Sequence, residues 1–330
     1  MKVAVGISGG VDSAVAALLL GEQGHEVIGV TMTLGRQDEE RSLAEAKAAA
    51  ARLGVPLEIF DFSREWDSNV LQYLRNVYLA GETPNPCVRC NETVKFALLP
   101  RAAFALGCER FATGHYARVE DGRLYRAVDK AKDQSYFLYR VMPEVLAKTI
   151  FPLGGLTKAE VREKARRFGL PVADKGDSQD FCGGDPMRIV GTVPKAGNIV
   201  TADGRVLGRH SGFWHYTIGK RRGLGIGGGT PYYVTGLDAV RNEVIVGFKE
   251  ASVVRVFRIG GVVSFADGAA IASPLTVKVR SAGEPKGPVI WRGETVECPE
   301  GLSGVAPGQS AVFYRGDEIV GGGIIRETSR

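Results

Sequence analysis

The stretch Lys2-Val-Ala-Val-Gly-Ile-Ser-Gly-Gly-Val-Asp-Ser13 decides how the first part of the chain folds. Residues 2–7 form an apolar run typical of a buried parallel strand, and residues 14–20 have the pattern of a packed helix. The two glycines between them let backbone N–H groups point inward, and the helix N-terminus adds a positive dipole. Ser8 and Ser13 add hydroxyl groups. The junction therefore predicts a site for a phosphate or pyrophosphate group.

Strands and helices alternate along the first 120 residues or so. In chain order we expect strands at residues 27–32, 55–60 and 110–113 and helices at residues 38–53, 64–79 and 91–106. The last helix is predicted to kink at Pro100. Such alternation implies right-handed βαβ units and a parallel sheet covered on both faces. Ligands of such sheets bind beyond the carboxyl ends of the strands, where Ser8, Met32 and Gly114 fall.

Two short signals indicate local structure before residue 170. Asp121-Gly122 predicts a hairpin turn, and Thr157-Lys-Ala-Glu160 is a capping box that begins a helix ending near Gly169. Lys158 and the other basic residues of this helix are interspersed with Glu. We therefore expect them to form a solvated face rather than an RNA contact surface.

The composition changes after about residue 197. Glycine becomes frequent, helical periodicity disappears, and short β-rich runs follow at residues 232–235, 244–246, 275–279 and 311–314. The predicted fold class is α/β, with a parallel-sheet catalytic domain at residues 1–197. A small β-rich domain at residues 198–250 and a C-terminal β-barrel at residues 251–330 complete the prediction.

Composition excludes several classes of protein. The chain has 330 residues of which 44% are hydrophobic, as in ordinary globular proteins of more than one domain. No apolar run approaches the roughly 20 residues of a membrane span, and Met1 leads directly into the first strand. Five cysteines, an odd number, favour reduced thiols in a cytoplasmic protein. The net charge of +5, with its largest excess in residues 198–250, is a mild bias toward a polyanionic partner.

Cysteines occur in two polar loops. Pro84-Asn-Pro-Cys-Val-Arg-Cys90 lies just before a predicted helix, whose N-terminus would favour the thiolate of Cys90, and Cys182 ends a second loop. Three cysteines are one ligand short of the usual zinc site, so a paired redox or sulfur-handling role for Cys90 and Cys182 is favoured. Cys108 and Cys298 are expected to be packing residues.

Together these motifs resemble one family. The pattern S-G-G-x-D-S is that of ATP pyrophosphatases rather than a Walker loop, because the Walker lysine is missing. Along nearly its full length the chain resembles the tRNA-specific 2-thiouridylases. The segments that carry this resemblance are residues 6–13, Thr83-Pro-Asn-Pro86 with Cys90-Asn91, Thr113-Gly-His-Tyr-Ala117, Lys132-Asp-Gln-Ser-Tyr-Phe137, Asp177-Ser-Gln-Asp180 with Cys182, Tyr216-Thr-Ile-Gly-Lys-Arg-Arg-Gly-Leu-Gly-Ile226 and Pro307-Gly-Gln309.

The resemblance implies ATP-dependent 2-thiolation of the wobble uridine of tRNA. The C2 oxygen would attack the α-phosphate of ATP, and sulfur from a persulfide on Cys182, assisted by Cys90, would replace the resulting AMP. Asp12 and the triphosphate would share a Mg²⁺ ion. The implied ATP-binding residues are Gly6, Ile7, Ser8, Gly9, Gly10, Val11, Asp12, Ser13, Met32 and Gly114. The implied tRNA contacts are Asn85, Pro86, Cys87, His115, Lys132, Asp133, Gln134, Arg280, Ser281 and Gln309.

Several alternatives remain open from sequence. Sulfur could come from a cysteine desulfurase, a sulfur-carrier protein or free sulfide. Cys87, Cys90 and Cys182 could instead hold a four-iron four-sulfur cluster with one open iron. Lys220-Arg-Arg222, the densest basic run, is interpreted as a phosphate contact. The rival functions are a pyrophosphate-loop ligase that adenylates a small-molecule carbonyl or carboxylate, and a non-catalytic RNA-binding protein.

Overall fold

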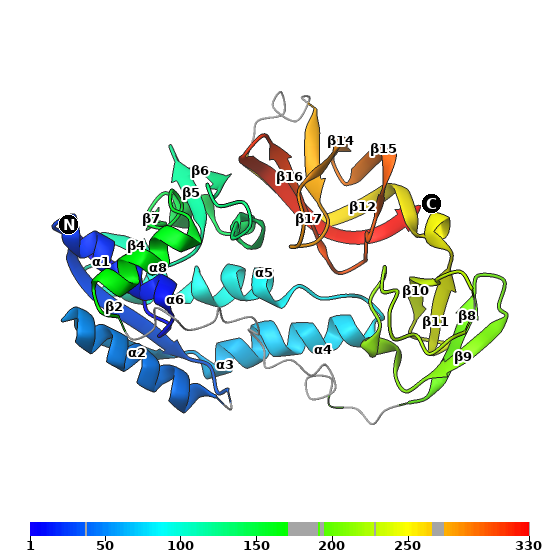
Figure 1. Ribbon diagram of the computed structural model, residues 1–330, viewed down its shortest axis with the longest axis horizontal. Helices are drawn as coiled ribbons and strands as arrows, with labels where there is room; N and C mark the ends of the chain where they lie inside the picture. The colour runs from blue at the N-terminus through cyan, green and yellow to red at the C-terminus, as the bar shows by residue number, and fades with distance from the viewer. Residues whose placement is uncertain (37, 171–190, 192–194, 228, 266–273, 330) are drawn as a thin grey trace. The chain divides into compact units, whose positions relative to one another are not determined.

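The computed structural model describes residues 1–36, 38–170, 191, 195–227, 229–265 and 274–329. The chain forms two compact units (Figure 1). Unit 1 comprises Met1–Val70, Cys87–Cys182 and Asp317–Ile319, and unit 2 comprises Leu71–Pro86, Gly183–Gly316 and Val320–Arg330. None of the helices in these described ranges has the length and apolar character needed to cross a membrane.

Unit 1 is built on a parallel sheet in the order β3-β2-β1-β4-β7. Its strands are β1 (Lys2–Gly6), β2 (Glu26–Thr33), β3 (Leu57–Asp61), β4 (Arg110–Ala112) and β7 (Thr149–Ile150). The strand order reverses at β1, which pairs in parallel with β2 on one side and β4 on the other. A ligand crevice is expected beyond the carboxyl ends of β1 and β4. The predicted α/β fold is confirmed.

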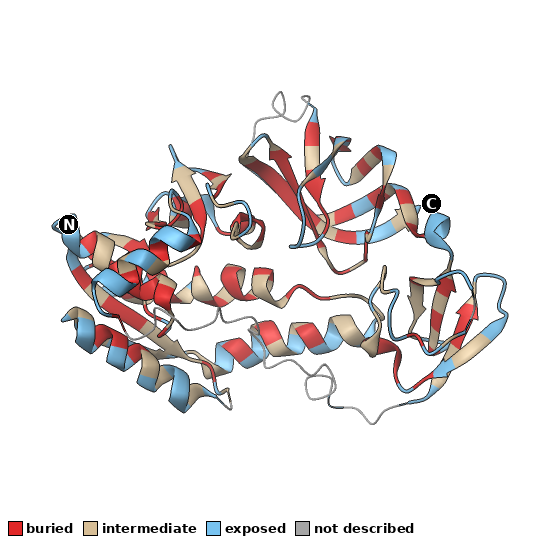
Figure 2. Ribbon diagram, in the orientation of Figure 1, coloured by how far each residue is buried: buried red, intermediate tan, exposed pale blue. Residues whose placement is uncertain are grey.

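Helices cover this sheet on both faces. They are α1 (Val11–Glu22), α2 (Glu39–Leu53), α3 (Ser63–Trp66), α5 (Pro86–Cys90), α6 (Leu98–Ala105), α7 (Pro143–Leu146) and α8 (Lys158–Arg167), with short turns η1 (Asp67–Leu71), η2 (Asn91–Lys95) and η3 (Ser135–Leu138). Small residues of α1 and α2 and Val161 of α8 share one buried core with Val3 and Val5. Figure 2 shows buried residues, in red, along both the helices and the strands of the protein. On the other face Phe96 packs edge-on against Phe111, with ring centroids 5.9 Å apart.

Two predicted helices differ from those observed. The helix expected at residues 64–79 is a succession of α3, η1 and α4 (Gln72–Leu79). The helix expected at residues 91–106 is interrupted between η2 and α6, not at Pro100. Pro100 is the third residue of α6, where a helix has no acceptor for an N–H, so proline is tolerated there.

The two local signals are confirmed. β5 (Ala117–Glu120) and β6 (Arg123–Arg126) form a hairpin whose turn residues Asp121 and Gly122 have φ of 50° and 75°. Thr157 and Glu160 form both hydrogen bonds of the capping box at the start of α8.

Unit 2 contains α4 and two β structures. The smaller sheet, in the order β10-β11-β8-β9, consists of β8 (Gly197–Thr201), β9 (Val206–His210), β10 (Tyr233–Asp238) and β11 (Glu243–Gly247), with short turns η4 (Phe213–His215) and η5 (Lys249–Ser252). Its core includes Trp214 and Val244, and Tyr78 of α4 packs against that core.

The second β structure is a closed barrel in the order β12-β15-β14-β13-β16-β17, with β12 pairing β17. Its strands are β12 (Val253–Ser264), β13 (Leu275–Lys278), β14 (Lys286–Arg292), β15 (Thr295–Ser303), β16 (Ser310–Arg315) and β17 (Glu318–Ser329). Inside the barrel Trp291 stacks on Phe313 with centroids 4.3 Å apart, and Cys298 is buried in the same core. The predicted small β domain and barrel are confirmed.

Candidate active site

The pyrophosphate loop, residues 6–13, connects β1 to α1 where the strand order reverses. Gly9 has a φ of 76°, and a Cβ atom there would lie 2.5 Å from the Cβ of Glu45 in α2. The Ser13 hydroxyl accepts a hydrogen bond from the N–H of Ser8 at 3.1 Å and donates one to the carbonyl of Gly10 at 3.0 Å. Gly10 has no side chain with which to cap α1, so the N–H groups of the first turn can serve an anion.

Gly114, which follows β4, lies against this loop. A Cβ atom at Gly114 would be 2.7 Å from the carbonyl carbon of Asp12 and 2.7 Å from the backbone nitrogen of Ser13. Met32, near the end of β2, lies at the same edge of the sheet. The structure thus places Gly114 against the pyrophosphate loop and Met32 one strand away from it. Both positions agree with contacts to a nucleotide bound at this edge of the sheet. The ATP-binding roles of the two residues stay predictions.

Asp12 is held by two side chains. The Lys158 ammonium lies 2.8 Å from each carboxylate oxygen, and the Tyr116 hydroxyl donates to Oδ1 at 2.9 Å. Lys158 is only 8% exposed, so its predicted place on a solvated face is wrong. The burial of Lys158 could not be recognised from the sequence, because the residue stands in a run of charged residues. The capping box was the available signal, because it fixes Lys158 as the first helical residue of α8.

Asp12 also fits a role in holding Mg²⁺. Magnesium in proteins is usually bound by one or two carboxylates together with substrate phosphates and water. In the part of the chain that the structure describes, no group of three or more His, Cys, Asp or Glu side chains could hold a metal ion. Asp12 is the carboxylate of the pyrophosphate loop that would hold the ion together with the triphosphate of ATP.

Cys87 and Cys90 lie one helical turn apart on α5. Cys90 is 1% exposed, and its burial raises the pKa of the thiol to about 11 although Lys95 and Arg36 act in the opposite direction. The predicted helix N-terminus that would favour a Cys90 thiolate is wrong, because Cys90 ends α5 with helical backbone angles and the helical backbone continues directly into η2.

His115 follows β4 and packs between two phenylalanines, with ring centroids 5.5 Å from Phe96 and 6.3 Å from Phe151. Its Nδ1 lies 2.8 Å from the Thr113 hydroxyl. Burial holds the pKa of His115 well below its usual value, and Lys95 lowers that pKa further. Phe96 directly follows η2, which continues from α5, so its contact with His115 brings this cysteine-bearing segment beside the carboxyl end of β4.

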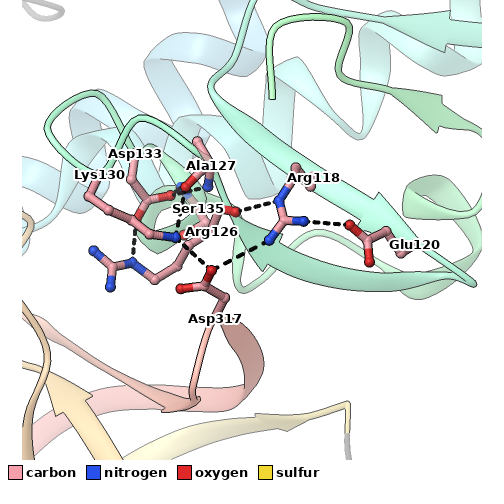
Figure 3. A network of polar contacts seen from close by, with 8 residues as sticks. All are labelled: Arg118, Glu120, Arg126, Ala127, Lys130, Asp133, Ser135 and Asp317. Carbon is pink, nitrogen blue, oxygen red and sulfur yellow. Dashed lines mark hydrogen bonds and ion pairs between the residues drawn. The ribbon is translucent and has the colours of Figure 1, made fainter. Parts of the chain in front are cut away.

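Asp133, a predicted tRNA contact, has a fully buried side chain. Its carboxylate accepts hydrogen bonds from the N–H groups of Ala127 and Ser135 at 3.1 and 3.2 Å and from Arg126 Nε at 3.3 Å (Figure 3). These bonds give Asp133 a structural role within unit 1. Its contact with tRNA stays a prediction.

Asp317 extends the same network. Its carboxylate pairs with Lys130 at 2.7 Å and Arg118 at 3.5 Å, and its carbonyl oxygen accepts from the N–H of Arg126 at 2.8 Å (Figure 3). The three residues Asp317–Ile319 belong to unit 1, although Glu318 and Ile319 are the first two residues of β17.

Comparison with known proteins decides the family. Models described as tRNA methyl transferase HUP domain, tRNA methyl transferase PRC-barrel domain and Aminomethyltransferase beta-barrel domain match residues 1–183, 190–248 and 260–325. The chain is 42% identical to the tRNA-specific 2-thiouridylase MnmA of Endomicrobium trichonymphae, over 98% of this chain and 99% of that protein. It is also 42% identical to that of Trichormus variabilis, over 99% of each chain, and 43% identical to that of Synechocystis sp., over 98% and 96%.

The chain belongs to the tRNA-specific 2-thiouridylase family. The resemblance seen in the motifs is confirmed. The domain limits at residues 197/198 and 250/251 remain predictions.

In this 2-thiouridylase family member, Gln309 of unit 2 is bonded to the main chain that leads to the cysteine helix. Its Nε2 donates to the carbonyls of Thr83 at 3.3 Å and Pro84 at 2.8 Å, and the N–H of Thr83 donates to the carbonyl of Pro307 at 2.9 Å. The next residue, Asn85, is 7% exposed. Gln309 was predicted as a tRNA contact, and sequence gave no sign of these bonds.

The other predicted RNA residues are dispersed. Arg280 and Ser281 are exposed after β13. Lys220 donates to the carbonyl of His215 at 2.9 Å and lies 4.9 Å from the centroid of the Tyr216 ring. Its neighbours Arg221 and Arg222 are exposed, as a phosphate contact requires. Cys182 lies outside the described residues.

Proposed function

We propose that the protein uses ATP to replace the C2 oxygen of the wobble uridine of tRNA by sulfur. Family membership and the pyrophosphate loop support this reaction, and they do not favour the ligase alternative. The observation that carries the proposal is the neighbourhood of Cys90. Arg36, which follows β2, and Lys95, which also acts on His115 after β4, both influence the Cys90 thiol. The ring of Phe96, which follows η2, lies 5.5 Å from the ring of His115, so the segment that continues from Cys90 packs at the edge of the sheet that carries the pyrophosphate loop.

The first half-reaction is adenylation. The uridine C2 oxygen attacks the α-phosphorus of ATP, a P–O bond forms, and pyrophosphate leaves. N–H groups of residues 10–13 would bind the phosphates, and Asp12 would hold Mg²⁺, whose charge would stabilise the leaving pyrophosphate. Activation is needed because AMP is a far better leaving group than the oxygen of a carbonyl.

The second half-reaction transfers sulfur. The terminal sulfur of a Cys182 persulfide bonds to C2 and loses its proton, and AMP leaves with the C2 oxygen. Cys90 then attacks the Sγ of Cys182, the S–S bond breaks, sulfur stays on C2, and a Cys90–Cys182 disulfide forms. An external thiol reductant must reduce that disulfide before the next turnover. A cysteine desulfurase or a sulfur carrier that itself bears a persulfide passes its outer sulfur to the Cys182 thiol and keeps a thiol of its own. Free sulfide can supply the sulfur only by attacking Cys182 Sγ in the Cys90–Cys182 disulfide, which breaks that S–S bond, leaves the persulfide on Cys182 and releases Cys90 as a thiol.

A cluster-based route would share the adenylation step and replace the persulfide relay by delivery of sulfide, so that no Cys90–Cys182 disulfide would form. Cys87 and Cys90, one turn apart on α5, would be two of the three thiolate ligands of a four-iron four-sulfur cluster, with Cys182 as the third. Iron and visible absorbance in anaerobically purified protein would support this route. Colourless protein that is fully active would exclude it.

The direct test is nucleoside mass spectrometry on unmodified tRNA incubated anaerobically with the protein, Mg-ATP and sulfide or a persulfide donor. We expect ATP-dependent 2-thiouridine that is absent with Cys90→Ser and Cys182→Ser and present with Cys108→Ser, a thiol buried before β4. Pyrophosphate without 2-thiouridine would contradict the sulfur-transfer step alone. Pyrophosphate release that needs no tRNA and survives both serine substitutions, with no 2-thiouridine formed, would favour the small-molecule ligase, which needs no thiols.

A further inference from the structure

Tyr116 and Lys158, whose side chains hold Asp12, are both bonded through their main chains to one surface segment, residues 129–134, which we call the 129–134 loop. Tyr116 forms a two-point pair with Gln134. The N–H of Tyr116 donates to Gln134 Oε1 at 3.0 Å, and the N–H of Gln134 donates to the Tyr116 carbonyl at 2.8 Å. The backbone N–H of Lys158 donates to Oδ2 of Asp129 at 3.0 Å.

The 129–134 loop is itself firmly anchored. The buried carboxylate of Asp133 is bonded to Arg126, Ala127 and Ser135 (Figure 3). Lys130 and Ala131, by contrast, are exposed, and Lys132 is partly exposed. One face of the loop thus meets solvent while its ends determine where Tyr116 and Lys158 lie.

Tyr116 is the more direct of the two connections. It is 2% exposed, so its hydroxyl cannot contact a bulky RNA in this conformation, and its hydrogen bond goes to Asp12 inside the pyrophosphate loop. A small displacement of Gln134 would move the Tyr116 backbone, and with it the hydroxyl that orients the Asp12 carboxylate.

We propose that Tyr116 is a positioning residue that couples RNA contact at the 129–134 loop to the orientation of Asp12. Cleavage of ATP is then fastest when tRNA holds this loop. This inference rests on the proposed function, because it takes the polyanion at Lys132 to be the tRNA substrate.

The test is Tyr116→Phe, which removes one hydroxyl from a ring that stays packed. Tyr125→Phe, on the half-buried strand β6, is the matched control. Three quantities are measured on the full chain: pyrophosphate release at saturating tRNA, the dissociation constant of tRNA, and 2-thiouridine in the product. We expect Tyr116→Phe to lower the rate of pyrophosphate release about tenfold, the usual effect of losing a hydrogen bond to a charged group, with tRNA affinity within about twofold of wild type. The control keeps both values.

A second pair of variants tests the hydrogen bonds between Gln134 and the main chain of Tyr116. Gln134→Leu removes the acceptor for the Tyr116 N–H and should reproduce the slower pyrophosphate release. Gln134→Glu keeps an acceptor oxygen and should restore the rate at saturating tRNA, even though its charge weakens RNA binding.

Three results would overturn the coupling. They are a Tyr116→Phe rate equal to wild type, a loss of tRNA affinity as large as the loss of rate, or a Gln134→Glu variant as slow as Gln134→Leu at saturating tRNA. A different result would contradict the proposed thiolation: wild-type protein would release pyrophosphate in the presence of tRNA and form no 2-thiouridine. Wild-type protein that releases no pyrophosphate with tRNA would overturn both.

Discussion

The ammonium of Lys158 lies 2.8 Å from both carboxylate oxygens of Asp12, although 146 residues separate them in the chain. Lys158 is the first residue of α8, and α8 packs beside α1 in the core of unit 1 (Figure 1). The pair places a cation at the mouth of a loop built for phosphate. Asp12 would hold Mg²⁺, and the ammonium of Lys158 would add positive charge that favours a bound triphosphate.

Replacement of Lys158 by Met should therefore slow pyrophosphate release at least about tenfold, because it removes a charge from the phosphate site and leaves Asp12 with one partner fewer. Lys158→Arg should retain part of the activity. Lys164→Met, on a later turn of α8, is the matched control and should behave as wild type. Pyrophosphate release at saturating ATP and tRNA is the measurement, and an unchanged rate in Lys158→Met would rule out this role.

Gly114 should tolerate no side chain. A Cβ atom there would lie 2.7 Å from main-chain atoms of Asp12 and Ser13, closer than real contacts allow, so Gly114→Ala must displace the pyrophosphate loop. We expect the dissociation constant of ATP to rise at least about tenfold, which corresponds to about 1.4 kcal/mol. Gly155→Ala, where a Cβ atom meets nothing within 4 Å, should bind ATP normally. Calorimetric titration with ATP compares the two variants.

Cys90 should react slowly with alkylating agents near neutral pH. Its burial raises the thiol pKa from 9.0 to about 11, so in the folded protein the thiolate appears only as the pH rises through that range. The folded protein binds the proton of the Cys90 thiol more tightly than the unfolded chain does. The contribution of this thiol to the free energy of unfolding is therefore complete below pH 9 and is lost between about pH 9 and 11.

Mass-spectrometric timing of iodoacetamide labelling from pH 7 to 11 measures this property. Labelling of Cys90 that is already fast at pH 7 and flat above it would show that the thiol is a thiolate in the free protein. Labelling in denaturant supplies the control for the intrinsic rate.

Gln309 should stabilise the main chain at Thr83 and Pro84, which leads to the cysteine-bearing helix α5. Gln309→Glu turns a donor toward the carbonyls of Thr83 and Pro84 into an acceptor, so the two hydrogen bonds are lost and oxygen atoms face each other. We expect a loss of about 2 kcal/mol in the free energy of unfolding and slower 2-thiouridine formation. Gln23→Glu, at the exposed end of α1, is the control. A large fall in tRNA affinity with unchanged unfolding would instead indicate a direct RNA contact.

Asp133→Ala should destabilise unit 1 by about 3 kcal/mol, because it leaves the buried Arg126 guanidinium without its carboxylate partner. The exposed pair of Arg118 and Glu120 offers the comparison, and Glu120→Ala should cost less than about 1 kcal/mol. Urea unfolding followed by circular dichroism measures both. Equal effects of the two substitutions would show that the Asp133 network contributes little.

The sequence by itself determined the parallel sheet, the hairpin at Asp121-Gly122, the capping box at Thr157 and the family. Each of these depends on interactions between residues close in the chain: the apolar period of a buried strand, a turn that needs positive φ, a side chain that satisfies the next N–H groups. The loop at residues 8–13 belongs with them, because strand, glycines and helix follow one another directly.

Tertiary structure decided which side chains meet. Lys158, Tyr116 and Gln134 reach Asp12 or its partners across distant segments, and no local pattern distinguishes a buried lysine from a solvated one in a charged helix. The Cys90 environment was misjudged for the same reason. The pKa of a thiol follows desolvation by residues packed around it, and that packing exists only once β2, α5 and β4 have come together.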